Sequence, residues 1–578
     1  MKKIFLLSFV LFIVGCRNSS SPEKELKILI DHYQNYGKDN SAEFPLGDYS
    51  ESRFEKYAVF CDSLKAKLKT IESKKINEDN QISYELLLYK LNETVVNYKF
   101  KTHWNPILSD AGFHSSLTYR VRKLNSKKAV LDYLNLLKAI PAYIDQQTEL
   151  IAKGLDAGLG QPLVIFEGYA STYEKHITKT AESNFYYSPF LKLPYYISKA
   201  EKDSLRHAAK DVIMGSVIPS FKKVKSFFEK IYYPKTRTSI GVSETPNGKE
   251  YYQSRIDLYT TLEMTPESIF KKGLEEVSRI KIQMASIIKE VQFKGSFIDF
   301  IAFLRTDSQF YAKTPEELLA HARNIAKKLD EQLPRYFKTL PRKPYGVAPV
   351  PDAIAPKYTS GRYVGTSPDS TDPGYYWVNT HNLPSRPLYA IPSLTAHEAV
   401  PGHHLQGSLN NELPESVAQF RRNLYISAYG EGWGLYSEYL ANEMGIYTTP
   451  YEHFGRLTYE MWRACRLVVD TGIHAFGWTR QEAVDFMTKN TALSIHEVNT
   501  EIDRYISWPG QALSYKIGEL KIRELREKAE NELRNLFDIR EFHEVILEKG
   551  TVTLPLLEKR ILNYIESKII SERRKKHF

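Results

Sequence analysis

Three of the chain's 15 histidines lie within eight residues, and a glutamate follows the first of them. The residues are His397, Glu398, His403 and His404. Two histidines on one face of a helix can bind a metal ion through neutral imidazoles, and a glutamate beside the first can take a proton from the activated water. These residue types therefore indicate zinc-dependent hydrolysis, with Glu398 as the general base.

The spacing departs from the simple H-E-x-x-H pattern, because His403 follows His397 by six positions and His404 follows it by seven. On an unbroken helix seven positions rise about 10 Å, which is too far for two ligands of one ion. Pro401 disfavours a straight helix, and Gly402 accepts unusual dihedral angles. We therefore expect a break that loops two residues out and returns His403 to the place of a second ligand. The alternative is two core histidines and a solvated one beside a helix break.

A glycine-rich segment, residues 429–438, lies downstream, with Glu431 28 positions after His403. It resembles the helix that supplies the third zinc ligand in gluzincin metallopeptidases, and Glu431 is the matching residue. Glu438 lies on the same helical face, where it could hydrogen-bond a ligand histidine. Three glycines in a helix cost about 1 kcal/mol each, so we expect a close backbone approach to the motif helix. The alternative is a surface helix with two exposed acids.

The wider pattern resembles the bacterial family catalogued as domain of unknown function 885, which is grouped with gluzincin-like peptidases. The resemblance covers nearly the full mature chain. The matching segments are 375–379, 395–406, 431–433, 466–474 and 509–518. The long motif is also similar to the Gly-His form in angiotensin-converting enzyme and thimet oligopeptidase, which favours His403 over His404 as the ligand. The resemblance implies a mainly α fold with a few short strands and a deep active-site channel between two lobes.

Residues that could assist the reaction follow the zinc motif. Related helical peptidases use a downstream tyrosine or histidine to stabilise the oxyanion, and the resemblance implies Tyr515 for this role. The alternative is a tyrosine that packs in the core. Arg504 and Lys516 could hold a substrate carboxylate, or they could be solvated charges.

Three further polar residues have both a functional and a structural interpretation. Asn379 could lie where a substrate backbone adds alongside a short strand, or it could be the turn residue that ends that strand. Asp470 and His474 are four positions apart on a predicted helix. They could support the metal ligands by hydrogen bonds, or they could form a satisfied pair in the core.

The elements that must position these residues are mostly predicted helices. Threonines that precede a proline or an acidic first turn mark three helix starts, at Thr265, Thr314 and Thr479. The best strand signals are residues 375–378 and 387–391. Residues 341–373 are rich in Pro, Gly, Ser and Asp, which predicts a long irregular connection that walls a cleft.

The N-terminus has the pattern of an exported bacterial lipoprotein. Lys2 and Lys3 precede an apolar run, residues 4–14, that is too short to span a bilayer, and Gly15-Cys16 ends it. We expect residues 1–15 to be a signal peptide, Cys16 to carry lipid and residues 16–25 to form a tether. The alternative is a plain secretory signal with a chance cysteine.

The length of 578 residues predicts more than one lobe. We expect an N-terminal helical lobe at residues 26–240 and a catalytic lobe at residues 241–578. The net charge is +10, and loss of the signal peptide would remove two lysines and leave +8. Such a charge could favour acidic substrates or anionic lipid headgroups. No nucleic-acid motif accompanies it, so we expect no nucleic-acid partner.

Together these features predict a zinc peptidase that is anchored to a bacterial membrane on its periplasmic or surface face and cleaves peptides. One alternative is a zinc hydrolase of non-peptide amides or esters. Another is a non-catalytic binding lipoprotein of the envelope, against which Glu398 argues, because a structural zinc site needs ligands and no base.

Overall fold

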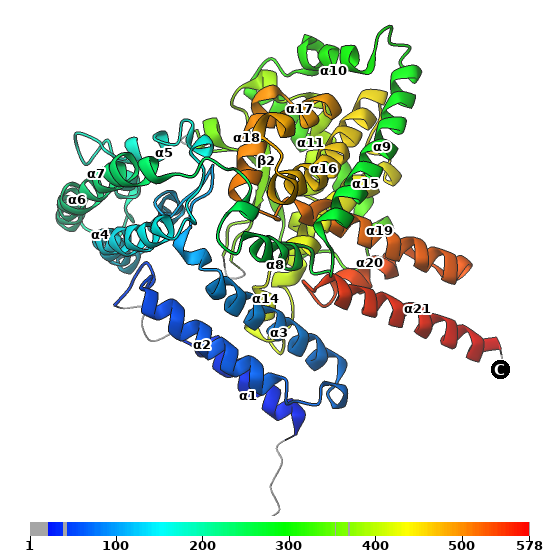
Figure 1. The fold of residues 1–578 in the computed structure, drawn as a ribbon, viewed down its shortest axis with the longest axis horizontal. Helices are drawn as coiled ribbons and strands as arrows, with labels where there is room; N and C mark the ends of the chain where they lie inside the picture. Colours follow the sequence, from blue (N-terminus) through cyan, green and yellow to red (C-terminus); the bar gives the residue numbers. More distant parts are fainter. Residues whose placement is uncertain (1–20, 38–42, 353, 368–369, 577–578) are drawn as a thin grey trace, which may run out of the picture.

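The computed structural model describes residues 21–37, 43–352, 354–367 and 370–576 (Figure 1). It is mainly helical, as the sequence predicts. The helices of the first part are α1 (Pro22–Asn35), α2 (Glu51–Leu68), α3 (Glu78–Lys99), α4 (Lys127–Asp156), α5 (Ser171–Glu174), α6 (Lys199–Val212) and α7 (Ile218–Phe227). In Figure 1, α1 to α3 run along the lower edge of the molecule, and α4 to α7 lie at the left.

The rest of the chain forms the larger helical body at the right of Figure 1. Its first helices are α8 (Gly248–Thr260), α9 (Pro266–Glu290), α10 (Phe297–Thr306) and α11 (Pro315–Tyr336). The motif region contains α12 (Ile391–Glu398), α13 (His403–Asn411), α14 (Gln419–Arg422), α15 (Ser427–Glu443) and α16 (Pro450–Phe476). The last helices are α17 (Arg480–Asn490), α18 (Ile495–Ser507), α19 (Leu513–Leu533), α20 (Ile539–Leu547) and α21 (Leu554–Lys576).

The three predicted helix starts are confirmed. The side chains of Thr265, Thr314 and Thr479 cap α9, α11 and α17 by accepting a backbone N–H of the first turn. α1 begins at Pro22, so the last residues of the predicted tether are helical. The predicted signal peptide and Cys16 lie outside the described residues. Among the described residues, no helix is both long enough and apolar enough to span a bilayer.

A small sheet has the strand order β1-β3-β2. β1 (Tyr345–Pro349) is parallel to β3 (Gly374–Val378), and β2 (Gly361–Val364) is antiparallel to β3. β3 confirms the first predicted strand, whereas β1 and β2 lie within the predicted irregular connection. The second predicted strand is wrong, because residues Leu388–Ala390 form a 3-10 turn that leads into α12. A short apolar run can be a buried helical turn as well as a strand, and periodicity does not separate the two.

The helices around the motif are held by long packed pairs. α16 packs along α9, and α15 packs along α19. Between them lies Lys516, which is fully buried and whose ammonium contacts Glu276, Glu460 and Glu519 at 2.9–3.0 Å. Burial opposes the charge of Lys516, but the three carboxylates outweigh it and raise its pKa. The network links α9, α16 and α19, because its charged groups come from all three helices. Removing one member would leave a buried charge unpaired.

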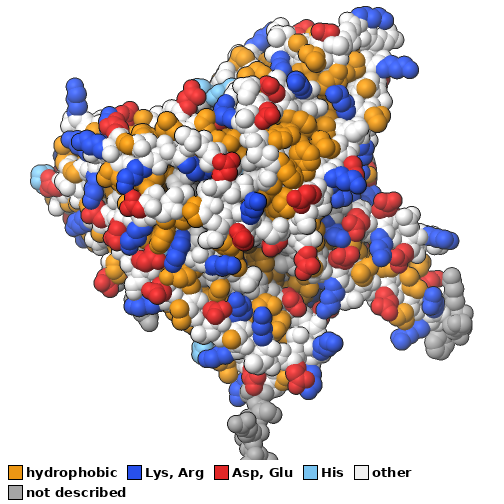
Figure 2. Space-filling model, in the orientation of Figure 1, with side chains coloured by type: hydrophobic (Ala, Val, Ile, Leu, Met, Phe, Trp, Pro, Cys, Tyr) orange, Lys and Arg blue, Asp and Glu red, His pale blue; other side chains and the backbone are white. Residues whose placement is uncertain are grey.

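The largest apolar cluster includes residues from both sides of residue 240, among them Ile213 and Val469. The predicted lobes at 26–240 and 241–578 stay a prediction. Cys61 and Cys465 are both buried and are not joined by a disulfide, and they belong to different apolar clusters. On the face shown in Figure 2, basic and acidic side chains are interspersed, so the net positive charge is not gathered into one patch there.

Candidate metal centre

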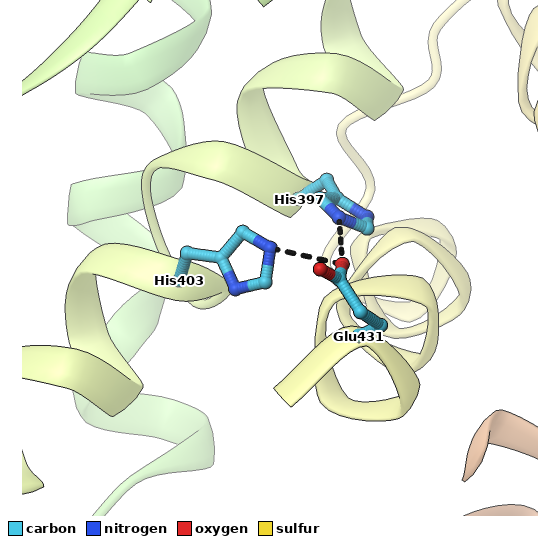
Figure 3. Close-up of side chains that lie close together, drawn as sticks. All are labelled: His397, His403 and Glu431. Carbon is cyan, nitrogen blue, oxygen red and sulfur yellow. Dashed lines mark ion pairs between the residues drawn. The ribbon is translucent and has the colours of Figure 1, made fainter. Parts of the chain in front are cut away.

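His397, His403 and Glu431 lie together although they come from three different helices (Figure 3). Their ligand atoms all lie within 4.8 Å of one another. Glu431 Oε2 is 3.5 Å from His397 Nε2 and 3.3 Å from His403 Nε2. Within the described part of the chain, this is the one group of His, Cys, Asp and Glu placed to hold a metal ion.

The predicted helix break is confirmed, and it is sharper than a bulge within one helix. α12 ends at Glu398, Ala399 leaves the helical region with φ −92° and ψ −110°, and α13 begins at His403. Gly402 packs against the end of α12, where an added Cβ would lie only 1.8 Å from the carbonyl oxygen of His397. Only glycine fits this approach. The tight turn therefore brings the His403 side chain beside that of His397.

The glycines of α15 allow close packing on two sides. A Cβ at Gly434 would lie 2.7 Å from the imidazole of His397, so the predicted approach to the motif is confirmed. A Cβ at Gly432 would lie 2.6 Å from Gly518 Cα in α19, so this glycine serves a second helix contact. Glu431 directly precedes these two glycines in α15 and reaches the two histidines.

The second ring nitrogen of His397 is also held. Its Nδ1 is 2.8 Å from Glu438 Oε1, and Arg463 Nη2 is 3.3 Å from the same oxygen. Burial opposes the charged imidazole, but hydrogen bonds with Glu431 and Glu438 outweigh it and raise the pKa of His397 to about 10. A carboxylate on Nδ1 orients the ring so that Nε2 faces Glu431, and a metal ion would displace a proton there.

A cavity of about 450 Å³ opens onto the cluster. His397 and His403 line it together with Glu398, whose Oε2 accepts the backbone N–H of Tyr363 at 2.7 Å. The side chain of His403 is 16% exposed and that of Glu431 13%, so the cluster is accessible from the cavity. β2 and the segment before it form part of the wall, which agrees with the predicted role of the connection 341–373.

Two of the residues predicted to assist the reaction also line the cavity. The ring of Tyr515 is stacked on that of His397 with centroids 6.4 Å apart. Arg504 lines the wall as well, with Nη1 3.3 Å from Glu501 and Nη2 donating to Gln511 at 2.6 Å.

Two other predicted residues point elsewhere. His404 Nδ1 lies 3.1 Å from Tyr363 Oη and 3.2 Å from Ser408 Oγ, and burial lowers the pKa of His404 to about 4. Its location therefore suits a core histidine better than a metal ligand. Lys516 is enclosed by the three carboxylates described above and does not line the cavity, so it is not available to a substrate.

Asn379, Asp470 and His474 are likewise outside the cavity wall. The amide of Asn379 donates to three backbone carbonyls at 3.0–3.1 Å and so shapes the loop before β2. Burial raises the pKa of Asp470 to about 7, and Asp470 accepts Tyr252 Oη at 2.6 Å. His474 lies between the backbone groups of residues 242 and 505, and burial lowers its pKa to about 3. All three have structural partners.

Several cavity residues were not predicted from the sequence. Tyr425 donates to Glu431 Oε1 at 2.8 Å, and Tyr363 contacts both Glu398 and His404. Arg463 and Arg466 line the cavity from α16. A signal for the arginines was present, because Arg463 and Arg466 are the two charged residues in the otherwise apolar run 461–469, and such residues predict buried partners or a site.

The spacing of the three side chains is compatible with a tetrahedral metal ion such as zinc. Zinc–ligand bonds of 2.0–2.2 Å in a tetrahedron separate two ligand atoms by about 3.4 Å, close to the distances from Glu431 Oε2 to His397 and His403. Two imidazoles and one carboxylate leave a fourth position, which the cavity can supply.

The family model described as "Bacterial protein of unknown function (DUF885)" matches residues 34–561. No curated protein matches the chain. A crystal structure from Colwellia psychrerythraea, described as a "putative lipoprotein", is similar with a TM-score of 0.85 and 27% identity. The matched region covers 95% of this chain and 100% of that chain. A structure from Shewanella oneidensis, described as a "putative lipoprotein of unknown function", shares the fold with a TM-score of 0.70 and 19% identity over 94% of this chain and 100% of its own.

Proposed function

The chain belongs to the DUF885 family of bacterial proteins of unknown function, and from this premise we propose that it is a zinc-dependent peptidase of the bacterial cell envelope. The observation that carries the proposal is the cluster of His397, His403 and Glu431 beside Glu398 in an open cavity. A structural zinc site needs four protein ligands and no base, whereas this arrangement has three ligands and a base.

When bound, zinc supplies Lewis acidity that activates water and polarises a carbonyl group. Glu398 accepts the proton of the attacking water and then donates it to the leaving amine. The Tyr363 N–H holds one oxygen of Glu398 and so fixes the direction of the carboxylate. Tyr515 donates a hydrogen bond to the developing oxyanion. Glu438 keeps the His397 ring in its orientation through Nδ1.

This arrangement supports a place in the gluzincin-like clan. The motif helix supplies His397 and Glu398, the turn returns His403, and Glu431 comes from the first turns of the next long helix. The same donor set would also hydrolyse other amides or esters. We propose a peptide because the order of motif helix, turn and third donor resembles that of gluzincin peptidases.

A mixed peptide library tests the proposal. The purified mature protein should cleave library members when it carries zinc, and mass spectrometry should detect the products. A chelator should abolish cleavage, and added zinc should restore it, because the ligand set holds an exchangeable ion. Cleavage that persists in the metal-free protein would contradict the zinc mechanism. A zinc-loaded protein that cleaves no peptide would contradict the peptidase assignment.

We also propose that Cys16 carries a lipid anchor. The sequence pattern supports it, and both similar structures are described as those of lipoprotein candidates. Cys16→Ser should therefore move the protein from the membrane fraction to the soluble fraction in its bacterial host, because the mature chain loses its acyl groups. Cys61→Ser is the matched control and should not change fractionation. An unchanged membrane fraction for Cys16→Ser would contradict the anchor.

A further inference from the structure

Part of the cavity wall is formed by α16 and α18 and carries arginines. Residues of α16 at positions 459, 462, 463 and 466 line the cavity, and their spacing of three and four places them on one helical face. Two of these are Arg463 and Arg466, and Arg504 joins them from α18. A single carboxylate, that of Glu501, serves both Arg466 and Arg504 at 2.8 and 3.3 Å. The group of Arg466, Arg504 and Glu501 therefore carries a net charge of about +1.

Arg466 is the member with an unused donor. It is only 2% exposed. Its Nε donates to Tyr505 Oη at 2.7 Å and its Nη2 donates to Glu501 Oε2 at 2.8 Å. Its Nη1 is buried and has no hydrogen-bond partner among the described residues. The charge of Arg466 is already paired with Glu501, but buried donors are normally hydrogen-bonded. The partnerless Nη1 of a residue that lines the cavity therefore points to an acceptor on a ligand, and the net positive charge of the group favours an anionic one.

The distance between His397 and Arg466 limits the size of that ligand. The Tyr515 ring is near both His397 and Arg466, with its centroid 6.4 Å from that of His397 and 4.2 Å from Arg466 Cζ. Laid end to end, these two distances place Arg466 no more than 10.6 Å from the His397 ring. An extended peptide advances about 3.3–3.6 Å per residue, so at most about three residues fit between them.

We propose that Arg466 binds the C-terminal carboxylate of a peptide, so that the enzyme removes one to three residues from the C-terminus. This inference rests on the proposed peptidase function and assigns its substrate class. A carboxylate carries one negative charge, which matches the net charge of the arginine group better than a phosphate dianion does. Arg463 lines the cavity beside this group, but its charge is paired with Glu438, whose Oε1 is 3.3 Å from Arg463 Nη2. Arg466 is a specificity-determining residue and takes no part in the proton transfers.

Pairs of hexapeptides that differ only in a free or amidated C-terminus test the proposal. The zinc-loaded wild type should release fragments of one to three residues from the free acids. Its kcat/KM for the amides should be lower by at least about tenfold, the scale of one lost charged hydrogen bond. If the amides are cleaved as well as the acids, or if internal bonds are cut throughout, the carboxylate assignment is wrong while the zinc peptidase function stands.

Binding provides a readout that does not depend on turnover. The zinc-loaded Glu398→Gln protein should bind the free-acid peptides at least about tenfold more tightly than the amides in calorimetry. If neither form is cleaved by the wild type but the free acids still bind preferentially, the peptidase proposal fails while the carboxylate site stands. Equal binding of both forms would overturn the carboxylate site.

Variants then assign the preference to one residue. Arg466→Gln should reduce the acid-to-amide ratio to near one with zinc content unchanged, and Arg466→Lys should keep part of it. Lysine retains the buried positive charge opposite Glu501, so it guards against simple unfolding. Arg480→Gln is the matched control, because Arg480 pairs with Asp503 outside the cavity wall. A folded Arg466→Gln protein that keeps the full preference would contradict the role of Arg466.

Discussion

Glu398→Gln should lower peptide turnover by about a hundredfold or more, the scale for loss of a positioned acid–base group. Glutamine has the same shape as glutamate but does not accept the proton of the attacking water at neutral pH. Its amide oxygen can still accept the Tyr363 N–H that holds Glu398 in the structure, so folding should be preserved. Zinc content should also be preserved, because Glu398 is not part of the ligand cluster.

The measurement pairs zinc analysis with single-turnover cleavage of a peptide that the wild type is known to cut. Glu398→Asp is an informative companion, because it keeps a carboxylate but withdraws it by one methylene. It should retain more activity than the glutamine variant if the proton acceptor matters, and less than the wild type if its position matters. A fully active Glu398→Gln protein would refute the general-base role.

Zinc content should respond in the opposite way to changes in the cluster. The wild type should hold about one zinc per chain, because three ligands and an open position form one site. His397→Ala should lose most of it. Glu431→Gln should bind zinc more weakly, because a neutral amide is a poorer ligand than a carboxylate.

Elemental analysis after equilibration with limiting zinc checks this expectation. His403→Ala and His404→Ala form the decisive pair, because the two histidines are adjacent in sequence but only His403 faces Glu431. His403→Ala should lose zinc, and His404→Ala should retain it, provided that circular dichroism shows both to be folded. Full zinc occupancy in His397→Ala, or metal loss confined to His404→Ala, would mean that the ligands are assigned wrongly.

The helical class and three helix starts followed from local sequence. Caps at Thr265, Thr314 and Thr479 act within one turn, so they can be recognised without knowledge of the fold. The segment 387–391 could not be assigned in this way, because Tyr389, Ala390 and Ile391 are buried in a turn that leads into α12. Burial by distant helices, which sequence periodicity does not record, decided its conformation.

The sequence by itself determined the chemistry that the site can offer, since residue types and the break at Pro401-Gly402 restrict the donors to a few candidates. Only the tertiary structure decided among them. It turns His403 toward Glu431 and His404 toward Tyr363, and it encloses Lys516 among carboxylates. It also brings Arg466 to the same cavity as the zinc motif. The physical reason is that side-chain partners and burial are set by contacts between helices far apart in the chain, whereas motifs and caps are set by neighbours within a few residues.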